Sequence, residues 1–399
     1  MIKNIVIIGA GPTGLFASSL LLKEGFSVDL YDQKKEPGRK LLLAGKSGLN
    51  ITNNLPLDSF ITAYGCRQKE IMPSLDLFTP KDLRLWLKEL GVETFEGSSG
   101  LIFPVLSGAK ELLSLWMESL YSYKNFKFHP EHQLIKVNKE TIHFKTANGL
   151  IKVNAPFAVM GMGGASYPST GSDGRWKNIL NNMDIKIKPF KPINCGFECS
   201  WSTYFKDYTD YSSLKNIKLT HKKQSIRGDI LITPYGVEGT PVYKLSREIR
   251  DAIEKKQQTT VYIDLTPDLS FEKILSRLKQ KRRKNSISNY LRKQLKLSPI
   301  KISILRELTE KKVFDDYSLL APQLKKLPLI LYKPRPIEEA ISSSGGVSFD
   351  ELDRFFMLKK YPGWFMAGEM VDWDATTGGY LLQACFSTAC MVVEGIKRL

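Results

Sequence analysis

The sequence is poor in the residues that build metal sites and disulfide frameworks. It has 5 Cys and 4 His among 399 residues, and no two cysteines form a Cys-x-x-Cys pair. An odd number of cysteines without paired spacing argues against a disulfide scaffold and against a zinc ribbon. We therefore expect no metal site, and a reducing compartment such as the cytoplasm.

Long hydrophobic runs and low-complexity tracts are also absent. No stretch approaches the ~18 uninterrupted apolar residues of a membrane-spanning helix, so we expect no membrane association. Hydrophobic residues make up 42% and charged residues 25% of the chain, which is the composition of an ordinary globular protein. At roughly 150 residues per domain, the length suggests two or three domains.

The amino-terminal segment predicts a strand, a helix and a second strand in close succession. Residues 3–9 are apolar on both faces, as in a buried parallel strand, and residues 14–24 have the apolar pattern of a helix. Residues 27–31 then read as a strand. This succession is a βαβ unit, the building block of a parallel sheet.

A glycine motif and an acid occupy the expected places in this unit. Gly9-x-Gly11-x-x-Gly14 separates the first strand from the helix, and Asp32 ends the second strand, 23 residues after Gly9. In a dinucleotide-binding fold such glycines permit a tight turn, close approach of a pyrophosphate, and helix-to-strand packing, and the acid accepts from a ribose hydroxyl. We expect a dinucleotide here; a glycine-rich turn without a ligand is the alternative.

Two further glycine-rich turns follow apolar segments. Residues 155–160 read as a buried strand that runs into a turn at 161–166, and the glycines at 378 and 379 open a final apolar helix. Between these segments the pattern changes: 192–265 has short alternating strands, and 271–313 is helical and rich in Lys and Arg. The dinucleotide domain is therefore expected to be split, with an insertion between its parts.

Positive charge is concentrated in the helical insertion. The chain has 58 Lys and Arg against 41 Asp and Glu, a net charge of +17, and residues 271–313 alone carry +11 of it. The densest group consists of Lys279, Lys281, Arg282, Arg283 and Lys284. This run predicts contact with a nucleic-acid backbone, and a solvated helical face is the equally weighted alternative.

Motifs along the whole chain resemble those of one family. Residues 37–52 (PGRKLLLAGKSGLNIT), the turn at 161–166, Ala367-Gly368-Glu369 and residues 378–384 (GGYLLQA) together resemble the BaiN/RdsA family of FAD-dependent oxidoreductases. One motif departs from it: the usual Gly-Gly-Gly-Arg-Cys-Asn run reads Gly-Lys-Ser-Gly-Leu-Asn at 45–50. The departure removes an Arg and a Cys near the expected flavin ring, and is typical of a separate branch of the family.

The resemblance implies an α/β fold with a three-layer Rossmann-type FAD-binding domain, an inserted β-barrel-like domain and a small helical domain. We assign 1–191 and 341–399 to the FAD-binding domain, 192–270 and 314–340 to the inserted β-rich domain, and 271–313 to the helical basic subdomain. The cofactor-binding residues that we expect are Gly9, Ala10, Gly11, Pro12, Thr13, Gly14, Asp32, Gln33, Arg39, Lys40, Gly45, Ser47, Asn50, Thr52, Gly161, Gly163, Gly164, Gly368, Glu369, Gly378, Gly379, Tyr380 and Leu382.

The resemblance also implies an activity. Family members reduce a uridine of large-subunit ribosomal RNA to dihydrouridine, which would make ribosomal RNA the partner of the basic insertion. Two alternatives stay open: oxidation or reduction of a small molecule such as an amine, aminoketone or enone, and RNA binding or assembly without turnover. No second complete GxGxxG motif is present, so NAD(P)H would contact the flavin only transiently, or the electrons would come from the substrate itself. No side chain stands out as catalytic, and Cys385 is more typical of a buried core thiol than of a proton donor.

Overall fold

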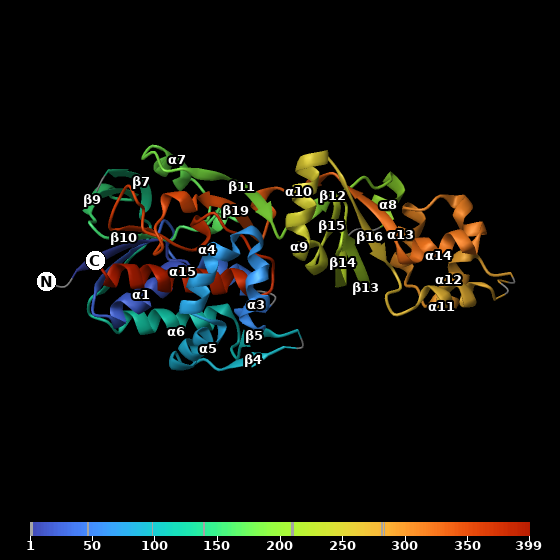
Figure 1. Cartoon of the computed structure of the whole chain (residues 1–399), viewed down its shortest axis with the longest axis horizontal. Coiled ribbons are helices and arrows are strands. Elements are labelled where there is room, and N and C mark those ends of the chain that lie inside the picture. Colours follow the sequence, from blue (N-terminus) through green and yellow to red (C-terminus); the bar gives the residue numbers. More distant parts are fainter. Residues whose placement is uncertain are drawn as a thin grey trace. The chain divides into compact units, whose positions relative to one another are not determined.

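The computed structural model describes residues 3–45, 48–97, 99–138, 140–208, 211–280, 282 and 284–399. The chain forms two compact units, the first made of Met1–Pro192 with Ile337–Leu399 and the second of Ile193–Pro336 (Figure 1). The first unit is therefore built from both ends of the chain. The finer division of the second unit, with a separate helical part at 271–313, stays a prediction.

A parallel sheet forms the centre of the first unit. Its strand order is β20-β10-β1-β2-β6, and all neighbouring strands are parallel. The strands are β1 (Asn4–Ile8), β2 (Ser27–Tyr31), β6 (Phe126–His129), β10 (Ala158–Met160) and β20 (Trp364–Met366). The side chains from Ile5 to Ile8 are all buried, because both faces of the sheet are covered.

Helices cover one face of this sheet and a β-meander covers the other (Figure 1). The helices are α1 (Pro12–Lys23), α6 (Ala109–Tyr121) and α15 (Tyr380–Lys397); the meander consists of β7 (Gln133–Asn138), β8 (Thr141–Thr146) and β9 (Gly149–Asn154). Trp116 of α6 donates a hydrogen bond to Ser19 of α1 (2.9 Å), and Phe144 of β8 stacks on Tyr31 of β2. These are the three layers expected of a Rossmann-type FAD-binding domain.

Smaller elements connect the layers of the first unit. The helices are α2 (Arg39–Ala44), α3 (Leu57–Phe60), α4 (Gln68–Leu77), α5 (Pro80–Glu89) and α7 (Trp176–Asn181), and the strands are β3 (Thr52–Asn53), β4 (Thr94–Glu96), β5 (Leu101–Pro104), β11 (Ile187–Ile193) and β19 (Ser342–Val347). The Gly, Lys, Ser and Asn content of residues 35–54 predicts a long loop without secondary structure, but α2 and β3 form inside it. The Leu41 side chain of α2 is buried in the core, which is the physical reason for a helical turn there.

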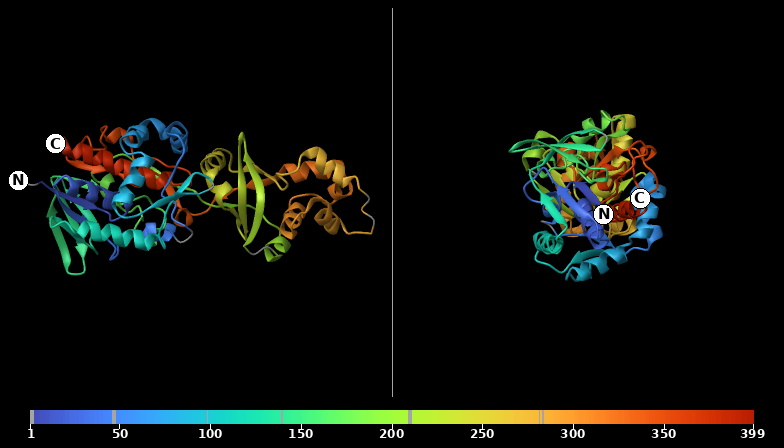
Figure 2. Two further views of the ribbon diagram at one scale, coloured as in Figure 1. Left: turned by 90° about the horizontal axis from the view of Figure 1, so that it is seen from below. Right: turned by 90° about the vertical axis from the view of Figure 1, so that its left-hand side faces the viewer.

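A curved antiparallel sheet dominates the second unit, with the order β17-β16-β13-β14-β15-β12-β18 (Figure 2). The strands are β12 (Phe197–Glu198), β13 (Ser212–His221), β14 (Gln224–Thr233), β15 (Gly236–Glu238), β16 (Thr259–Asp264), β17 (Leu327–Leu331) and β18 (Lys333–Pro334). Only Tyr332 separates the two edge strands β17 and β18, and its N–H donates to the carbonyl of Glu198 (3.0 Å). The sheet is therefore a nearly closed barrel, as predicted.

Helices accompany the barrel-like sheet of the second unit (Figure 1). They are α8 (Thr203–Tyr208), α9 (Thr240–Lys244), α10 (Ser246–Lys256), α11 (Phe271–Leu278), α12 (Ile287–Leu295), α13 (Pro299–Glu307) and α14 (Tyr317–Lys325). Ser270 and Ser286 cap the first turns of α11 and α12 by accepting from backbone N–H groups. Among the described residues, no helix combines the length and the apolar character needed to span a bilayer.

Candidate functional site

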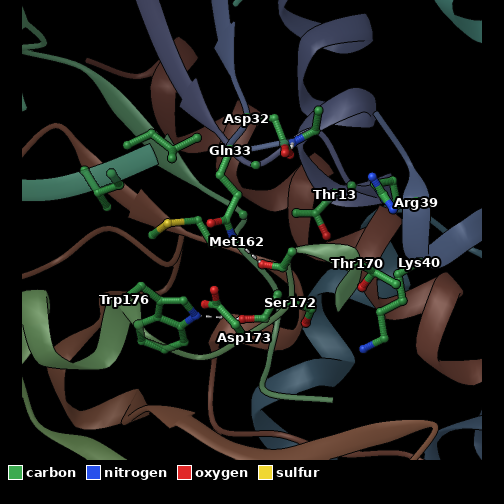
Figure 3. A pocket seen from close by; sticks show the side chains of 18 of the residues that line it. Thr13, Asp32, Gln33, Arg39, Lys40, Met162, Thr170, Ser172, Asp173 and Trp176 are labelled. Atoms are coloured by element: carbon green, nitrogen blue, oxygen red, sulfur yellow. Dashed lines mark hydrogen bonds between the residues drawn. The ribbon is translucent and has the colours of Figure 1, made fainter. Parts of the chain in front are cut away.

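A cavity opens in the first unit where three parallel strands end (Figure 3). Strands β1, β2 and β10 end at Ile8, Tyr31 and Met160, and residues that follow each of them line the cavity. Of the predicted cofactor residues it brings together Gly9, Ala10, Gly11, Pro12, Thr13, Asp32, Gln33, Arg39, Lys40, Gly161, Gly163 and Glu369. The carboxyl edge of a parallel sheet is the usual ligand site of such folds.

The three glycines of the first turn are glycine for different reasons. Gly9 has φ +104°, and a Cβ there would lie 2.5 Å from the carbonyl oxygen of Gly161; a Cβ on Gly14 would lie 1.9 Å from the carbonyl oxygen of Gly9. Gly11 has an ordinary φ of −82°, and a Cβ there would meet no atom within 4 Å. The protein itself therefore explains Gly9 and Gly14, whereas Gly11 leaves open space that a ligand would fill.

Helix α1 presents free backbone donors to this space. Its N-cap is Gly11, which supplies no side-chain cap, and its first turn holds no acidic residue. Uncapped N–H groups and the positive end of the helix dipole favour an anion. A pyrophosphate at this turn fits both the open space and the donors.

Asp32 binds the turn from the end of β2. Its carboxylate accepts from the N–H of Ala10 (2.6 Å) and from the N–H of Lys34 (2.7 Å). Burial raises the pKa of Asp32 above its ordinary value, and these two backbone hydrogen bonds oppose the shift. The neighbouring Gln33 donates to the carbonyl of Gly171 (2.7 Å), which joins this strand end to a second loop.

That second loop follows the glycine turn at 161–166. Trp176 donates to the carbonyl of Gly163 (2.9 Å), and Gly163 has φ +73°. The hydroxyl of Ser172 lines the cavity and is buried, yet it has no hydrogen-bond partner among the residues that the structure describes. A buried hydroxyl without a partner is costly, so Ser172 is suited to a polar group of a ligand.

Lys40, Glu369 and Ser166 form a polar cluster at the cavity. The Nζ of Lys40 donates to Glu369 Oε2 (2.8 Å) and to Ser166 Oγ (2.6 Å). The thiol of Cys385 lies close by. Its burial is the main reason why its pKa is raised to about 12, and the charge of Glu369 adds to this shift. This thiol also lines the cavity, and it stays protonated near neutral pH.

The remaining predicted residues that the structure describes do not line this cavity. Gly14 lies in the first turn of α1 and packs against the carbonyl of Gly9. A Cβ on Gly368 would lie 2.3 Å from Thr13 Oγ1, and a Cβ on Gly164 would lie 2.0 Å from Ser343 Oγ. Gly45 approaches Ala109 in the same way. Close packing accounts for glycine at these positions.

Several other predicted cofactor residues form a group of their own. A Cβ on Gly379 would lie 2.5 Å from Thr52 Cα, the Thr52 hydroxyl donates to Gln383 (2.8 Å), and Asn50 donates to the carbonyl of Thr52 (2.8 Å). Helix α15 begins after Gly379 with neither a side-chain cap nor an acid in its first turn. The assignment of Asn50, Thr52, Gly378, Gly379, Tyr380 and Leu382 to the cofactor stays a prediction, and Ser47 falls outside the described residues.

The sequence interpretation missed a large part of the cavity wall. The missed residues are Ile8, Glu36, Gly38, His132, Gln133, Leu134, Met162, Thr170, Gly171, Ser172, Asp173, Arg175, Trp176 and Ile179. The stretch Ser-Thr-Gly-Ser-Asp-Gly at 169–174 carried a usable signal, because a polar cluster with two glycines directly after a buried strand marks a loop. The residues that β7 contributes to the cavity wall, Gln133 and Leu134, carried no such signal in the sequence.

Comparison with known proteins gives the family. The model of the HI0933-like protein Rossmann domain matches residues 3–395. The chain belongs to this family. It is 24% identical to a protein of Escherichia coli K12 named ribosomal RNA dihydrouridine synthase (97% of this chain, 96% of that protein), and 24% identical to one of the same name from Haemophilus influenzae (98% of each). A Clostridium scindens protein named 3-dehydro-bile acid delta(4,6)-reductase is 22% identical over 97% of each chain.

Solved structures share the fold. The 3-ketosteroid-delta4-(5alpha)-dehydrogenase of Rhodococcus jostii RHA1 superposes with a TM-score of 0.52 at 13% identity, over 98% of this chain and 95% of that one. The 3-ketosteroid delta1-dehydrogenase of Sterolibacterium denitrificans gives 0.54 at 9% identity, over 99% and 100%. The expected Rossmann-type fold and the expected family, that of BaiN/RdsA FAD-dependent oxidoreductases, are confirmed.

Proposed function

We propose that this FAD-dependent oxidoreductase reduces a uridine of large-subunit ribosomal RNA to dihydrouridine. One observation carries the proposal: two relatives named ribosomal RNA dihydrouridine synthase match it over 96–98% of their own length, so the similarity extends across both units. Such a substrate would place the protein in the cytoplasm. It would also give the positive charge of residues 271–313 a polyanionic partner.

The reaction adds a hydride and a proton across the C5–C6 bond of the uracil ring. That bond is conjugated to the C4 carbonyl, which accepts negative charge as the hydride arrives. Bound FAD supplies the electrons for this type of chemistry. The chain has to hold the cofactor, exclude water and place the substrate base against the flavin.

The cavity of the first unit supports the binding of FAD. In this proposal the pyrophosphate lies at the Gly9–Gly14 turn, where Gly11 leaves open space and the first turn of α1 offers backbone donors. Asp32 accepts from an adenosine ribose hydroxyl, and the unpartnered Ser172 hydroxyl binds a further polar group. Lys40 carries positive charge at the wall of this cavity, and its ion pair with Glu369 orients the Lys40 side chain.

Reduced flavin has to be regenerated, and we propose NAD(P)H as the donor. The sequence has a single GxGxxG motif, which the FAD occupies. NAD(P)H would therefore contact the flavin transiently and would leave before RNA enters. Rapid bleaching of the yellow flavin by NADH or NADPH without oxygen tests this step.

A small-molecule substrate is the second candidate, favoured by the relative from Clostridium scindens. The name of that protein specifies reduction of carbon–carbon double bonds in a ketosteroid, which are activated by a conjugated carbonyl as the uracil bond is. The two candidates therefore share their chemistry and differ in substrate size. Anaerobic reoxidation of the reduced flavin by an enone, unaffected by added RNA, would support the small molecule.

Nucleoside mass spectrometry of ribosomal RNA from a deletion strain tests the main proposal. We expect dihydrouridine to disappear from one position of the large-subunit RNA and to return with the wild-type gene. Complementation with Gly11→Val, which lacks space for the pyrophosphate, should not restore it. Unchanged dihydrouridine content in the deletion strain would refute the RNA substrate.

A further inference from the structure

A second cavity lies wholly within the second unit, between α8 and the helices α12 and α13. Its volume is about 340 Å³, within the ~300–1,000 Å³ of pockets that hold small organic groups. It is lined by Tyr204, Phe205, Ser288, Asn289, Arg292, Pro299, Ile302, Ser303, Arg306 and Glu307. None of these residues belongs to the run at 279–284 that the sequence singled out.

Two arginines give this cavity its charge. Arg292 lies one helical turn after Ser288 on α12, and Arg306 lies one turn after Ile302 on α13, so each guanidinium shares a helix face with other lining residues. Among the described residues, neither arginine has a hydrogen-bond or ion-pair partner. Both side chains are exposed, so their charge is available to a ligand.

The one acid of the cavity is engaged elsewhere. Glu307 Oε1 accepts from the N–H of Ser202 (2.6 Å), and Oε2 accepts from its hydroxyl (2.7 Å). Ser202 precedes α8, and its hydroxyl also accepts from the N–H of Phe205 (3.2 Å). Glu307 therefore fastens the start of α8 to α13, and among the described residues it forms no ion pair with either arginine.

Helix α8 brings aromatic rings to the basic helices. Phe205 is 2% exposed and packs on Trp201, with ring centroids 4.9 Å apart, so it forms the floor. Tyr204 is 80% exposed at the cavity. An exposed ring on an anchored helix is a stacking surface for a nucleobase, and the nearby guanidinium groups match phosphates.

We propose that this cavity binds an unpaired nucleotide of an RNA strand, with the base on Tyr204 and the flanking phosphates on Arg292 and Arg306. The inference rests on the proposed ribosomal RNA substrate and names the surface that holds it outside the flavin site. A single strand fits better than a duplex, because a stacked and paired base does not expose its ring face. The polar side chains of Ser288, Asn289 and Ser303 can reach the ribose or the base edge.

The aromatic contact is tested by binding of a fluorescein-labelled, uridine-rich single-stranded RNA of about 12 nucleotides to the full-length protein. Tyr204→Ala should weaken binding about 5- to 150-fold, the range of one lost base stack. Tyr204→Phe keeps the ring and should bind as wild type does. The same RNA annealed to its complement should bind more weakly than the single strand. Equal affinity of the Tyr204→Ala variant and wild type would overturn the proposal.

The arginines are tested by the salt dependence of the same binding. Each phosphate contact contributes about 0.7 to the slope of log affinity against log salt for a single strand. Arg292→Ala with Arg306→Ala should therefore lower the slope by about 1.4. Lys215→Ala with Lys223→Ala removes two exposed positive charges of the same unit outside the cavity, and should change the slope much less. Equal changes in both double variants would refute a specific site.

The outcome for this site is separable from that for the proposed function. RNA binding is measured without turnover. The loss of affinity in the Tyr204 and Arg292 variants can therefore be present even if the dihydrouridine content is unchanged in the deletion strain. That combination would support the RNA-binding cavity and refute uridine as the substrate. If dihydrouridine depends on the gene but these variants bind RNA and restore the modification as wild type does, the substrate stands and the cavity proposal fails.

Discussion

Lys40 and Glu369, 329 residues apart in sequence, form an ion pair of 2.8 Å at the wall of the cavity in the first unit. Their side chains are 23% and 12% exposed, so water screens the pair weakly. The pair joins α2 to the segment after β20 and thereby connects the two halves of the split domain. It is expected to stabilise the fold as well as the site.

Removal of one partner of this pair should be costly, because the other charge is left partly buried. We expect Glu369→Gln or Lys40→Met to lower the free energy of unfolding by about 1–3 kcal/mol. The double variant should lose less than the sum of the two. Urea unfolding of flavin-free protein measures this without a contribution from the cofactor.

A matched pair on the surface serves as the control. The Nζ of Lys23 lies 2.6 Å from Oε2 of Glu89, and these side chains are 49% and 64% exposed. Lys23→Met should cost at most about 1 kcal/mol, as exposed pairs do. If both pairs had the same small effect, the buried position of Lys40 would have no energetic role.

Gly11 and Gly14 should respond differently to a larger side chain. The Cβ that Gly11→Val adds meets no protein atom within 4 Å, so we expect colourless protein whose flavin-free form has a free energy of unfolding within about 1 kcal/mol of wild type. Gly14→Ala drives a Cβ against the Gly9 carbonyl and should cost about 3 kcal/mol. Flavin absorbance per protein and urea unfolding separate the two effects; retained stoichiometric FAD in the Gly11→Val protein would refute the placement of the pyrophosphate.

The sequence predicted the first half of the site because its signals are local. The Gly9–Gly14 spacing and Asp32 belong to one βαβ unit, in which backbone geometry alone brings them together. The loop that carries Ser172 and Trp176 was missed, since its position depends on contacts such as that of Gln33 with Gly171, 138 residues away. The pairing of Lys40 with Glu369 was missed for the same reason, because the two residues are distant in sequence and only the fold brings them together.

In the second unit, too, local patterns were predictable from the sequence and contacts between distant segments were not. Its β-rich part and its basic helices follow from strand alternation and Leu spacing, which are readable along the chain, whereas the barrel-like form of the sheet was implied by the family resemblance. Tyr290 of α12 is buried and offers no stacking surface. Tyr204 and Phe205 reach α12 and α13 from a helix far upstream, a juxtaposition that only the fold reveals. Lys281 and Arg283 of the predicted basic run lie outside the described residues.

Asp32 should make the affinity for FAD depend on pH. Burial raises its pKa above the ordinary 3.8, so its carboxylate becomes protonated at a higher pH than an exposed Asp would. The protonated form no longer accepts well from a ribose hydroxyl. Affinity for FAD should therefore fall as the pH decreases through this raised pKa, and recover above it.

Asp32→Asn is the matched variant for this titration. An amide has no acidic proton, so FAD should bind more weakly at neutral pH but without the acid limb. Fluorescence titration of FAD at several pH values distinguishes the two proteins. An unchanged acid limb in the Asn variant would assign the pH dependence to another group.

Cys385 should resist alkylation in the folded protein, whereas Cys66 should react. Burial and the charge of Glu369 raise the pKa of Cys385 to about 12, and only the thiolate attacks iodoacetamide. Cys66 is exposed, so peptide mapping after treatment at about pH 8 should find the label on Cys66 and not on Cys385. Unfolding in urea should expose Cys385 to the label. Equal labelling of both thiols in the folded protein would contradict the burial of Cys385.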